Sequence, residues 1–285
     1  MLKWLALILM LLDHIGYYFY FAIPSEHYWL LRAVGRLAFP IFCYYIVLGY
    51  QRTRQLNQYI LRLGLFAVGG QILLELTGWL TNLEPIRSVM FTLLAGLLFI
   101  FGLDLILHSS RDLTAMMRVV PADLPASMAP TQDYGVRINL KGITLPLWQG
   151  LLYGLLLIVG AILIIALVYP DYGWFGLSTI VLFYLMDLRQ PDMTMQGHRQ
   201  TLLEIGRWMI SFLLLNLIFA LIDIGHGAEV SWSLFESLSV LAIPLFPLHE
   251  RDKRRYSRVS KYFFYIFYPV HLCVLMLLST WLRMH

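Results

Sequence analysis

Asp13 and His14 place a carboxylate and an imidazole side by side within an apolar run, Leu2–Ala22, that is long enough to cross a membrane as one helix. An ionisable side chain near the centre of a bilayer costs about 2.5 kcal/mol or more, so it is retained mainly where function needs it. At a rise of about 1.5 Å per residue, His14 lies about 18 Å from Leu2, near the middle of a hydrocarbon core about 30 Å thick. A neutral imidazole at that depth is able to accept a proton.

The spacing of two further ionisable residues relates them to His14, one by helix face and the other by depth in the membrane. Lys3 stands eleven residues earlier, and eleven steps of about 100° return to within about 20° of the same helix face. A second histidine, His271, follows Lys261 by ten residues in the last apolar run and lies about 15 Å deep, just after Pro269. We expect the two histidines to reach similar depths on helices that run in opposite directions, where they could line one cavity.

Other polar residues within the apolar runs have a simpler interpretation, because an interhelical hydrogen bond contributes about 0.6 kcal/mol and requires no chemistry. We favour that interpretation for Gln71, Thr92 and Asn216, and we expect Asp104 to lie at the membrane interface. Arg36, which opens the second apolar run, is either an ordinary boundary residue or a functional group.

The chain that must position these groups has the composition of a membrane protein. Of its 285 residues, 59% are hydrophobic and 13% are charged, whereas soluble domains carry about 25% charged residues. The sequence predicts an all-α, polytopic transmembrane helix bundle that forms a single domain over residues 1–285. Nine spans are expected: Leu2–Ala22, Gly35–Tyr50, Tyr59–Gly78, Val89–Leu107, Leu145–Val168, Trp174–Met186, Ile205–Ile224, Trp232–Leu248 and Tyr262–Leu282.

The distribution of basic residues orients these spans. With the N-terminus in the cytoplasm, 17 of the 21 Lys and Arg residues fall on the inner side, as the positive-inside rule requires. We therefore predict a cytoplasmic N-terminus, an extracytoplasmic C-terminus and a location in the cell inner (plasma) membrane. The Pro-rich segment at about 109–144 is expected to be a cytoplasmic lid or linker. Cys43 and Cys273 lie within apolar runs and predict no disulfide.

The inner loops are basic enough to bind a polyanionic nucleotide. Arg52, Arg54 and Arg62 occupy one loop, and six cations lie between His249 and Lys261 in another. The alternative is the ordinary enrichment of cations beside membrane spans, which also accounts for the formal net charge of +4 without a nucleic-acid partner. No metal is expected, because Asp13, His14 and His271 offer no compact third and fourth ligand.

Several stretches resemble the TraX family, which is related to membrane acyltransferases of the acyltransferase-3 type. They are LDHIG at 12–16, GRLAFPIFCYYIVLGYQRTR at 35–54, YILRLGLFA at 59–67, MFTLLAGLL at 90–98, YPDYGWFG at 169–176 and KYFFYIFYPVHL at 261–272. The spacing of Lys3 and His14 also resembles a basic-residue-to-histidine motif of the wider group. Before the last span the chain reads LHERDKRRYSR, which keeps the basic character of the family's YNGKRG-like turn and lacks its glycines.

The resemblance implies a transmembrane acetyltransferase that uses acetyl-CoA. The best-known member of the family N-acetylates a conjugative pilin, and for this chain the acceptor is expected to be an amine or hydroxyl of a peptide, a cell-surface glycan or a lipid. His14 is expected to act as general base or acyl carrier, Asp13 as its orienting or charge-balancing partner, His271 as a second catalytic group and Arg36 near the acceptor. CoA phosphates are expected at Lys3, Arg52, Arg54, Arg62 and Arg255.

Two other functions fit the same intramembrane residues. A proton-coupled transporter or flippase could relay protons through the histidines, although the chain shows no inverted repeat. An accessory protein could use its polar side chains only to join helices, in which case His14 would be replaceable without loss of function.

Overall fold

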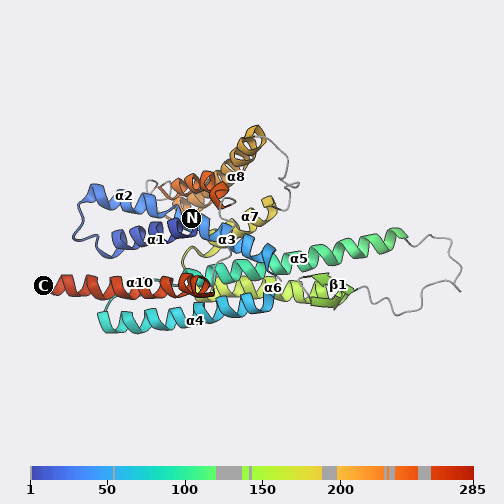
Figure 1. Ribbon diagram of the computed structural model, residues 1–285, viewed down its shortest axis with the longest axis horizontal. Helices are drawn as coiled ribbons and strands as arrows, with labels where there is room; N and C mark the ends of the chain where they lie inside the picture. The colour runs from blue at the N-terminus through green and yellow to red at the C-terminus, as the bar shows by residue number, and fades with distance from the viewer. Residues whose placement is uncertain are drawn as a thin grey trace, which may run out of the picture.

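The computed structural model describes residues 2–53, 55–119, 137–140, 143–187, 198–227, 230, 235–249 and 258–285. Apart from one hairpin, the regular structure in these ranges is helical, which confirms the all-α prediction. In chain order the elements are α1 (Leu2–Tyr18), α2 (Ser25–Gly35), α3 (Ala38–Arg52), α4 (Leu56–Thr81), α5 (Val89–Val119), β1 (Arg137–Leu140), β2 (Ile143–Pro146), α6 (Leu147–Val168), α7 (Gly173–Asp187), α8 (His198–Gly225), η1 (Glu236–His249) and α10 (Arg258–Met284) (Figure 1).

Each of the nine predicted spans coincides with a helix of the structure. Three of those helices, α1, α7 and the 3-10 helix η1, are short. The other six lie in stretches of the described chain that are long and apolar enough to cross a membrane: Ser25–Arg52, Leu56–Thr81, Val89–Ser109, Trp148–Val168, Leu202–Gly225 and Tyr262–Met284. A 3-10 helix rises about 2.0 Å per residue, so the 14 residues of η1 extend about 28 Å, close to the thickness of a hydrocarbon core. The chain is a multi-pass membrane protein.

Helix α2 was not predicted as a separate element. It precedes α3 after a short break at Arg36 and Leu37, and the two helices together form the candidate span Ser25–Arg52. Pro40 accounts for the break, because it lacks the N–H that would bond the carbonyl of Arg36 in a continuous helix and lies instead in the first turn of α3. The break places Arg36 between two helix ends.

Long helices form one side of the bundle and position α10. Figure 1 shows α10 running beside α4, where the rings of Phe66 and Tyr265 stack with centroids 5.0 Å apart. Helices α5 and α6 approach so closely that a Cβ atom on Gly102 would lie 2.6 Å from the carbonyl oxygen of Gly154. Only glycine permits that approach, and it fixes the two helices against each other.

Helices α1 and α10 run in the same direction, which corrects the expectation of opposite directions. Contacts between them advance together along both chains: Trp4 meets Phe264, His14 meets His271, and the hydroxyl of Ser279 donates to the carbonyl of Tyr18 at 2.9 Å. The expectation overlooked that the first and the ninth of nine consecutive spans must cross in the same sense.

The segment predicted as a loop at about 109–144 is partly regular. Helix α5 continues to Val119, because residues 109–119 contain neither proline nor glycine and include good helix formers. Strands β1 and β2 form an antiparallel hairpin that pairs Arg137 with Pro146 and Leu140 with Ile143. In Figure 1 the end of α5 and this hairpin extend from the bundle on the same side.

Candidate functional site

His14 and His271 form a directly bonded pair at the seam between α1 and α10. The Nε2 atom of His271 lies 3.0 Å from Nδ1 of His14, and the ring centroids are 5.0 Å apart. Both residues are buried, with exposed fractions of 8% and 7%. The structure therefore brings together the two histidines predicted to share one site, and we call them the imidazole pair.

The surroundings of His271 assign the protons in this pair. Its Nδ1 atom lies 2.7 Å from the carbonyl oxygen of Phe267, which can only accept, so Nδ1 of His271 carries a hydrogen. A neutral imidazole has one N–H, so Nε2 of His271 accepts and Nδ1 of His14 donates. In this arrangement Nε2 of His14 carries no hydrogen, and its lone pair is available as a base.

Asp13 contacts Arg32 of α2, whereas the ring of His14 points to α10. One guanidinium nitrogen, Nη1 of Arg32, lies 2.8 Å from Oδ2 of Asp13 and donates to the Asp13 main-chain carbonyl at 3.3 Å. The two side chains are 9% and 12% exposed, so this is a buried ion pair. Residues 13 and 14 point about 100° apart on a helix, which is why their side chains meet different partners.

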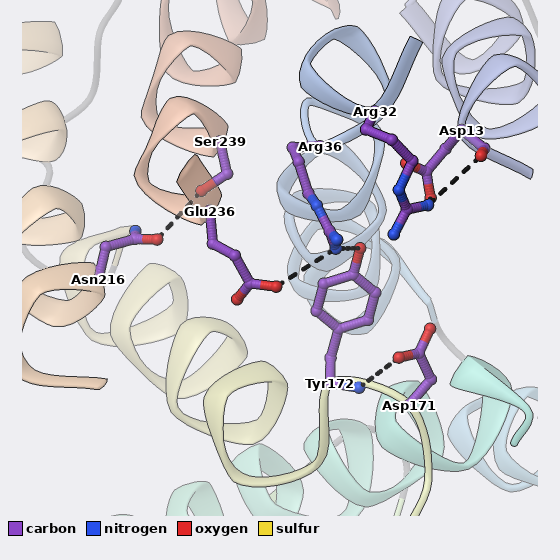
Figure 2. Close-up of polar contacts among 8 residues, drawn as sticks. All are labelled: Asp13, Arg32, Arg36, Asp171, Tyr172, Asn216, Glu236 and Ser239. Carbon is purple, nitrogen blue, oxygen red and sulfur yellow. Dashed lines mark hydrogen bonds and ion pairs between the residues drawn. The ribbon is translucent and has the colours of Figure 1, made fainter. Parts of the chain in front are cut away.

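Arg36 lies between two segments that are far from it in sequence. Its Nη1 atom donates to the hydroxyl of Tyr172 at 3.3 Å and lies 3.5 Å from a carboxylate oxygen of Glu236 (Figure 2). Figure 2 places this contact next to the Asp13–Arg32 pair. We call the group the charged cluster, and it consists of Asp13, Arg32, Arg36, Tyr172 and Glu236.

A strained turn between α6 and α7 holds Tyr172 in place. Tyr172 has φ 62 and Gly173 has φ 30, in the left-handed region that non-glycine residues rarely adopt. The Tyr172 ring stacks on Phe39 with centroids 3.7 Å apart and planes within 2°. Thr92 donates its hydroxyl to the carbonyl of Asp171, and burial raises the pKa of the Asp171 carboxyl to about 6. Strained backbone that is supported in this way is typical of functional sites.

Of the predicted nucleotide-binding residues, the structure describes Lys3, Arg52 and Arg62. The ammonium of Lys3 lies 4.7 Å from the ring centroid of Tyr45 and 5.6 Å from that of Phe264, so Lys3 and His14 both face α10. Arg52 ends α3, and Arg62 lies near the start of α4, where it donates to the carbonyl of Gln58. Arg54 and Arg255 lie outside the described residues.

The polar residues expected to join helices do so. Asn216 accepts from the hydroxyl of Ser239 at 3.2 Å, and Gln71 accepts from the main-chain N–H of Ser88 at 2.8 Å. Asp104, expected at the interface, is 7% exposed and accepts a 2.5 Å hydrogen bond from Tyr50. That bond compensates the burial of the carboxylate.

Three members of the charged cluster were not predicted as site residues: Arg32, Tyr172 and Glu236. Arg32 stands one helical turn before Arg36, a spacing that places both cations on one face. Tyr172 belongs to the YPDYG stretch at 169–173, whose three left-handed residues at 169, 172 and 173 are not evident from the letters alone. Among the described residues, no group of three His, Cys, Asp or Glu side chains is arranged to hold a metal ion.

The comparison with protein families decides what kind of chain carries this site. The model of the TraX protein family matches residues 1–279. The chain belongs to the TraX family. A search of curated proteins and a search of solved structures returned no match. The TraX family is associated with pilin N-acetylation, and both polar clusters of this chain lie within the matched region.

Proposed function

We propose that this TraX protein is an acetyltransferase that moves the acetyl group of cytoplasmic acetyl-CoA to an amine or hydroxyl at or across the inner membrane. The observation that carries the proposal is the imidazole pair, because the hydrogen bond of His14 to His271 leaves Nε2 of His14 unprotonated. Acyl transfer requires such a base, together with exclusion of water.

In the proposed reaction, Nε2 of His14 removes the proton of the acceptor group as that group attacks the thioester carbonyl. The carbon–sulfur bond breaks when the tetrahedral intermediate collapses, and the imidazolium returns the proton to the leaving sulfur, which departs as the thiol of CoA. His271 supports this cycle by accepting the Nδ1 hydrogen of His14, which holds the ring in the productive tautomer. If His14 instead carries the acetyl group, the same nitrogen attacks the thioester and the carbon–sulfur bond breaks, which releases CoA as the thiolate. The acceptor then attacks the acetyl-imidazole, His14 leaves as the neutral imidazole, and the proton of the acceptor passes to the thiolate.

The donor is expected to bind at the end of α1 that bears Lys3. Arg52 and Arg62 lie at the ends of α3 and α4 that meet there, since Tyr59 of α4 approaches Gly49 of α3. The helical distance from Lys3 to His14 is about 16 Å, which an extended pantetheine arm of about 15 to 20 Å can bridge. Arg54 and Arg255 are proposed to add contacts to the phosphates. Arg36 is proposed to lie on the acceptor side.

The test is acetyl transfer by the purified protein in lipid, with radiolabelled acetyl-CoA and model acceptors that carry either an amine or a hydroxyl. We expect transfer to one class, and we expect CoA binding to weaken as the salt concentration rises, because exposed phosphate contacts are screened. A protein that neither binds CoA nor transfers acetyl groups, yet moves protons across a vesicle membrane, would be a transporter and would contradict the proposal.

The proposed orientation has its own test. We expect the N-terminus in the cytoplasm and the C-terminus outside, because 17 of the 21 basic residues then lie on the inner side. A reporter that is active only in the cytoplasm should be silent when it is fused after His285. Activity of that fusion would mean that the number of predicted spans is wrong by one, with Trp174–Met186 as the first span to re-examine.

A further inference from the structure

Helix α1 is held from two directions, by α2 through Asp13 and by α10 through His14. The Asp13–Arg32 ion pair is buried, and a buried ion pair contributes little net stability because removing both charges from water offsets their attraction. Such a pair is therefore better explained by the geometry it imposes than by the stability it adds. Here the ion pair orients α1 at Asp13, the residue directly before the proposed base, His14.

The contact between α1 and α2 is close enough for Arg32 to set the rotation of α1. A Cβ atom on Gly35 would lie 2.3 Å from Cβ of Asp13, and one on Gly16 would lie 3.3 Å from Cδ of Arg32. The Arg32 guanidinium also lies 5.7 Å from the ring centroid of Tyr17. Arg32 thus contacts α1 at positions 13, 16 and 17, which form one face of that helix.

A small rotation of α1 would separate the imidazole pair. At about 6 Å from the helix axis, a turn of about 20° moves a side chain by about 2 Å. That displacement would break the 3.0 Å bond between His14 and His271. Without this bond, His14 loses its contact with α10, and its ring keeps only the hydrogen bond to the carbonyl of Met10 on its own helix.

We infer that Arg32 is a positioning residue for the proposed transfer reaction: through Asp13 it fixes the rotation of α1 and so keeps His14 in register with His271. Arg32 touches neither acetyl donor nor acceptor in this scheme. The inference rests on the proposed acetyltransferase function for its kinetic consequence. Its structural consequence, the state of the hydrogen bond between His14 and His271, is independent of any activity.

The kinetic test is a double-mutant cycle with Arg32→Gln and Asp13→Asn. Misplacement of a catalytic group by about 1 Å lowers rates by about 100-fold, so we expect each single variant to lose about that factor in kcat, with KM for acetyl-CoA within about threefold. The double variant should be no worse than the weaker single variant, because both changes remove one contact. Arg283→Gln, which removes an arginine packed over Phe21 at the far end of α10, is the matched control and should keep wild-type kcat.

The structural test uses nitrogen NMR of histidine-labelled protein, with the His14 signal assigned from His14→Gln. In the wild type, Nδ1 of His14 should show nitrogen–nitrogen coupling to Nε2 of His271 across their hydrogen bond, and Arg32→Gln should lose that coupling. If Arg32→Gln does not fold, the double variant, which buries no unpaired charge, gives the same readout. Wild-type kcat in Arg32→Gln or in the double variant, additive losses, or an unchanged His14 signal would overturn the inference. Absence of acetyl transfer in the wild type would instead contradict the proposed function, and the NMR result would still decide the role of Arg32.

Discussion

The imidazole pair and the charged cluster both include residues of α1. The first is a neutral hydrogen-bonded pair, whereas the second is a group of mostly charged side chains. The imidazole pair joins two side chains through one hydrogen bond and is satisfied without any net charge. The charged cluster joins α1, α2, the α6–α7 turn and η1 through guanidinium, carboxylate and phenol groups (Figure 2). A neutral pair can gain or lose a proton with little rearrangement, whereas removing one member of a charge cluster leaves its partner uncompensated. The first arrangement suits proton transfer and the second suits fixed geometry.

The largest expected effect is at the proposed base. His14→Gln keeps the size and hydrogen-bonding capacity of the side chain but cannot shuttle a proton, so acetyl transfer should fall by about 10³-fold. CoA affinity should stay within about threefold, because the lost interaction belongs to the transition state. Steady-state kinetics and calorimetric titration with CoA measure the two quantities. Full activity would remove His14 from the mechanism.

A pair of substitutions at His271 sharpens the assignment of tautomers. His271→Leu removes the acceptor for the Nδ1 hydrogen of His14 and should lower kcat by about 100-fold. His271→Gln retains a carbonyl oxygen that can accept this hydrogen, so its kcat should stay within about tenfold of the wild type. Equal losses in the two variants would mean that His271 exchanges protons itself.

Arg36 tests whether the charged cluster serves geometry more than proton transfer. Arg36→Gln should lower kcat/KM for the acceptor by about tenfold and the free energy of unfolding by about 2 kcal/mol, because Tyr172 and Glu236 lose a shared charged partner. The pH dependence of kcat should be unchanged. Arg87→Gln, an exposed arginine that donates to the carbonyl of Val168, is the control. A shifted pH profile in Arg36→Gln would assign the cluster a part in proton transfer.

Asp171, which precedes Tyr172 of the charged cluster, is expected to make the stability of the fold depend on pH. Its pKa of about 6 lies above the usual value of 3.8, because burial disfavours the charged form. The protonated carboxyl therefore stabilises the fold fully below about pH 4, and this contribution, up to about 2 kcal/mol, is lost as the pH rises through 6. In Asp171→Asn, this loss between pH 4 and 6 should disappear from thermal unfolding curves. Parallel curves for the two proteins would contradict a raised pKa.

The smallest effect is expected at the donor end. Lys3→Gln should raise KM for acetyl-CoA by about two- to fivefold at low salt, because partly exposed ion contacts contribute about 1 kcal/mol or less. The difference from the wild type should vanish at high ionic strength. A loss of kcat comparable with that of His14→Gln would show that Lys3 does more than hold phosphate.

Periodicity and charge predicted the features that depend on local sequence. His14 and His271 were placed at one site because depth along a helix follows directly from residue spacing, and each of the nine apolar runs overlaps a helix of the structure. The partner of Asp13 could not be found in this way. Arg32 belongs to a short helix of mixed polarity that carries no transmembrane signal, and its contact depends on glycine-mediated packing between two helices.

The charged cluster illustrates the same limit over a longer range. Tyr172 and Glu236 reach Arg36 from 136 and 200 positions away in the sequence, through a left-handed turn and a 3-10 helix that contains Pro244 and Pro247. Neither backbone conformation follows from hydrophobic periodicity. The relative direction of α1 and α10, by contrast, could have been predicted from the number of spans. With nine spans, an odd number, the first and the last cross the membrane in the same direction.

The imidazole pair joins residues 257 positions apart, in the first and last helices of the chain. At a synthesis rate of about 5 to 20 residues per second, His14 leaves the ribosome about 13 to 50 s before His271 does. Throughout that interval the membrane holds an apolar helix whose histidine lacks its partner on α10. The protein therefore acquires its proposed base only when synthesis is nearly complete, and a chain released early is expected to insert without becoming active.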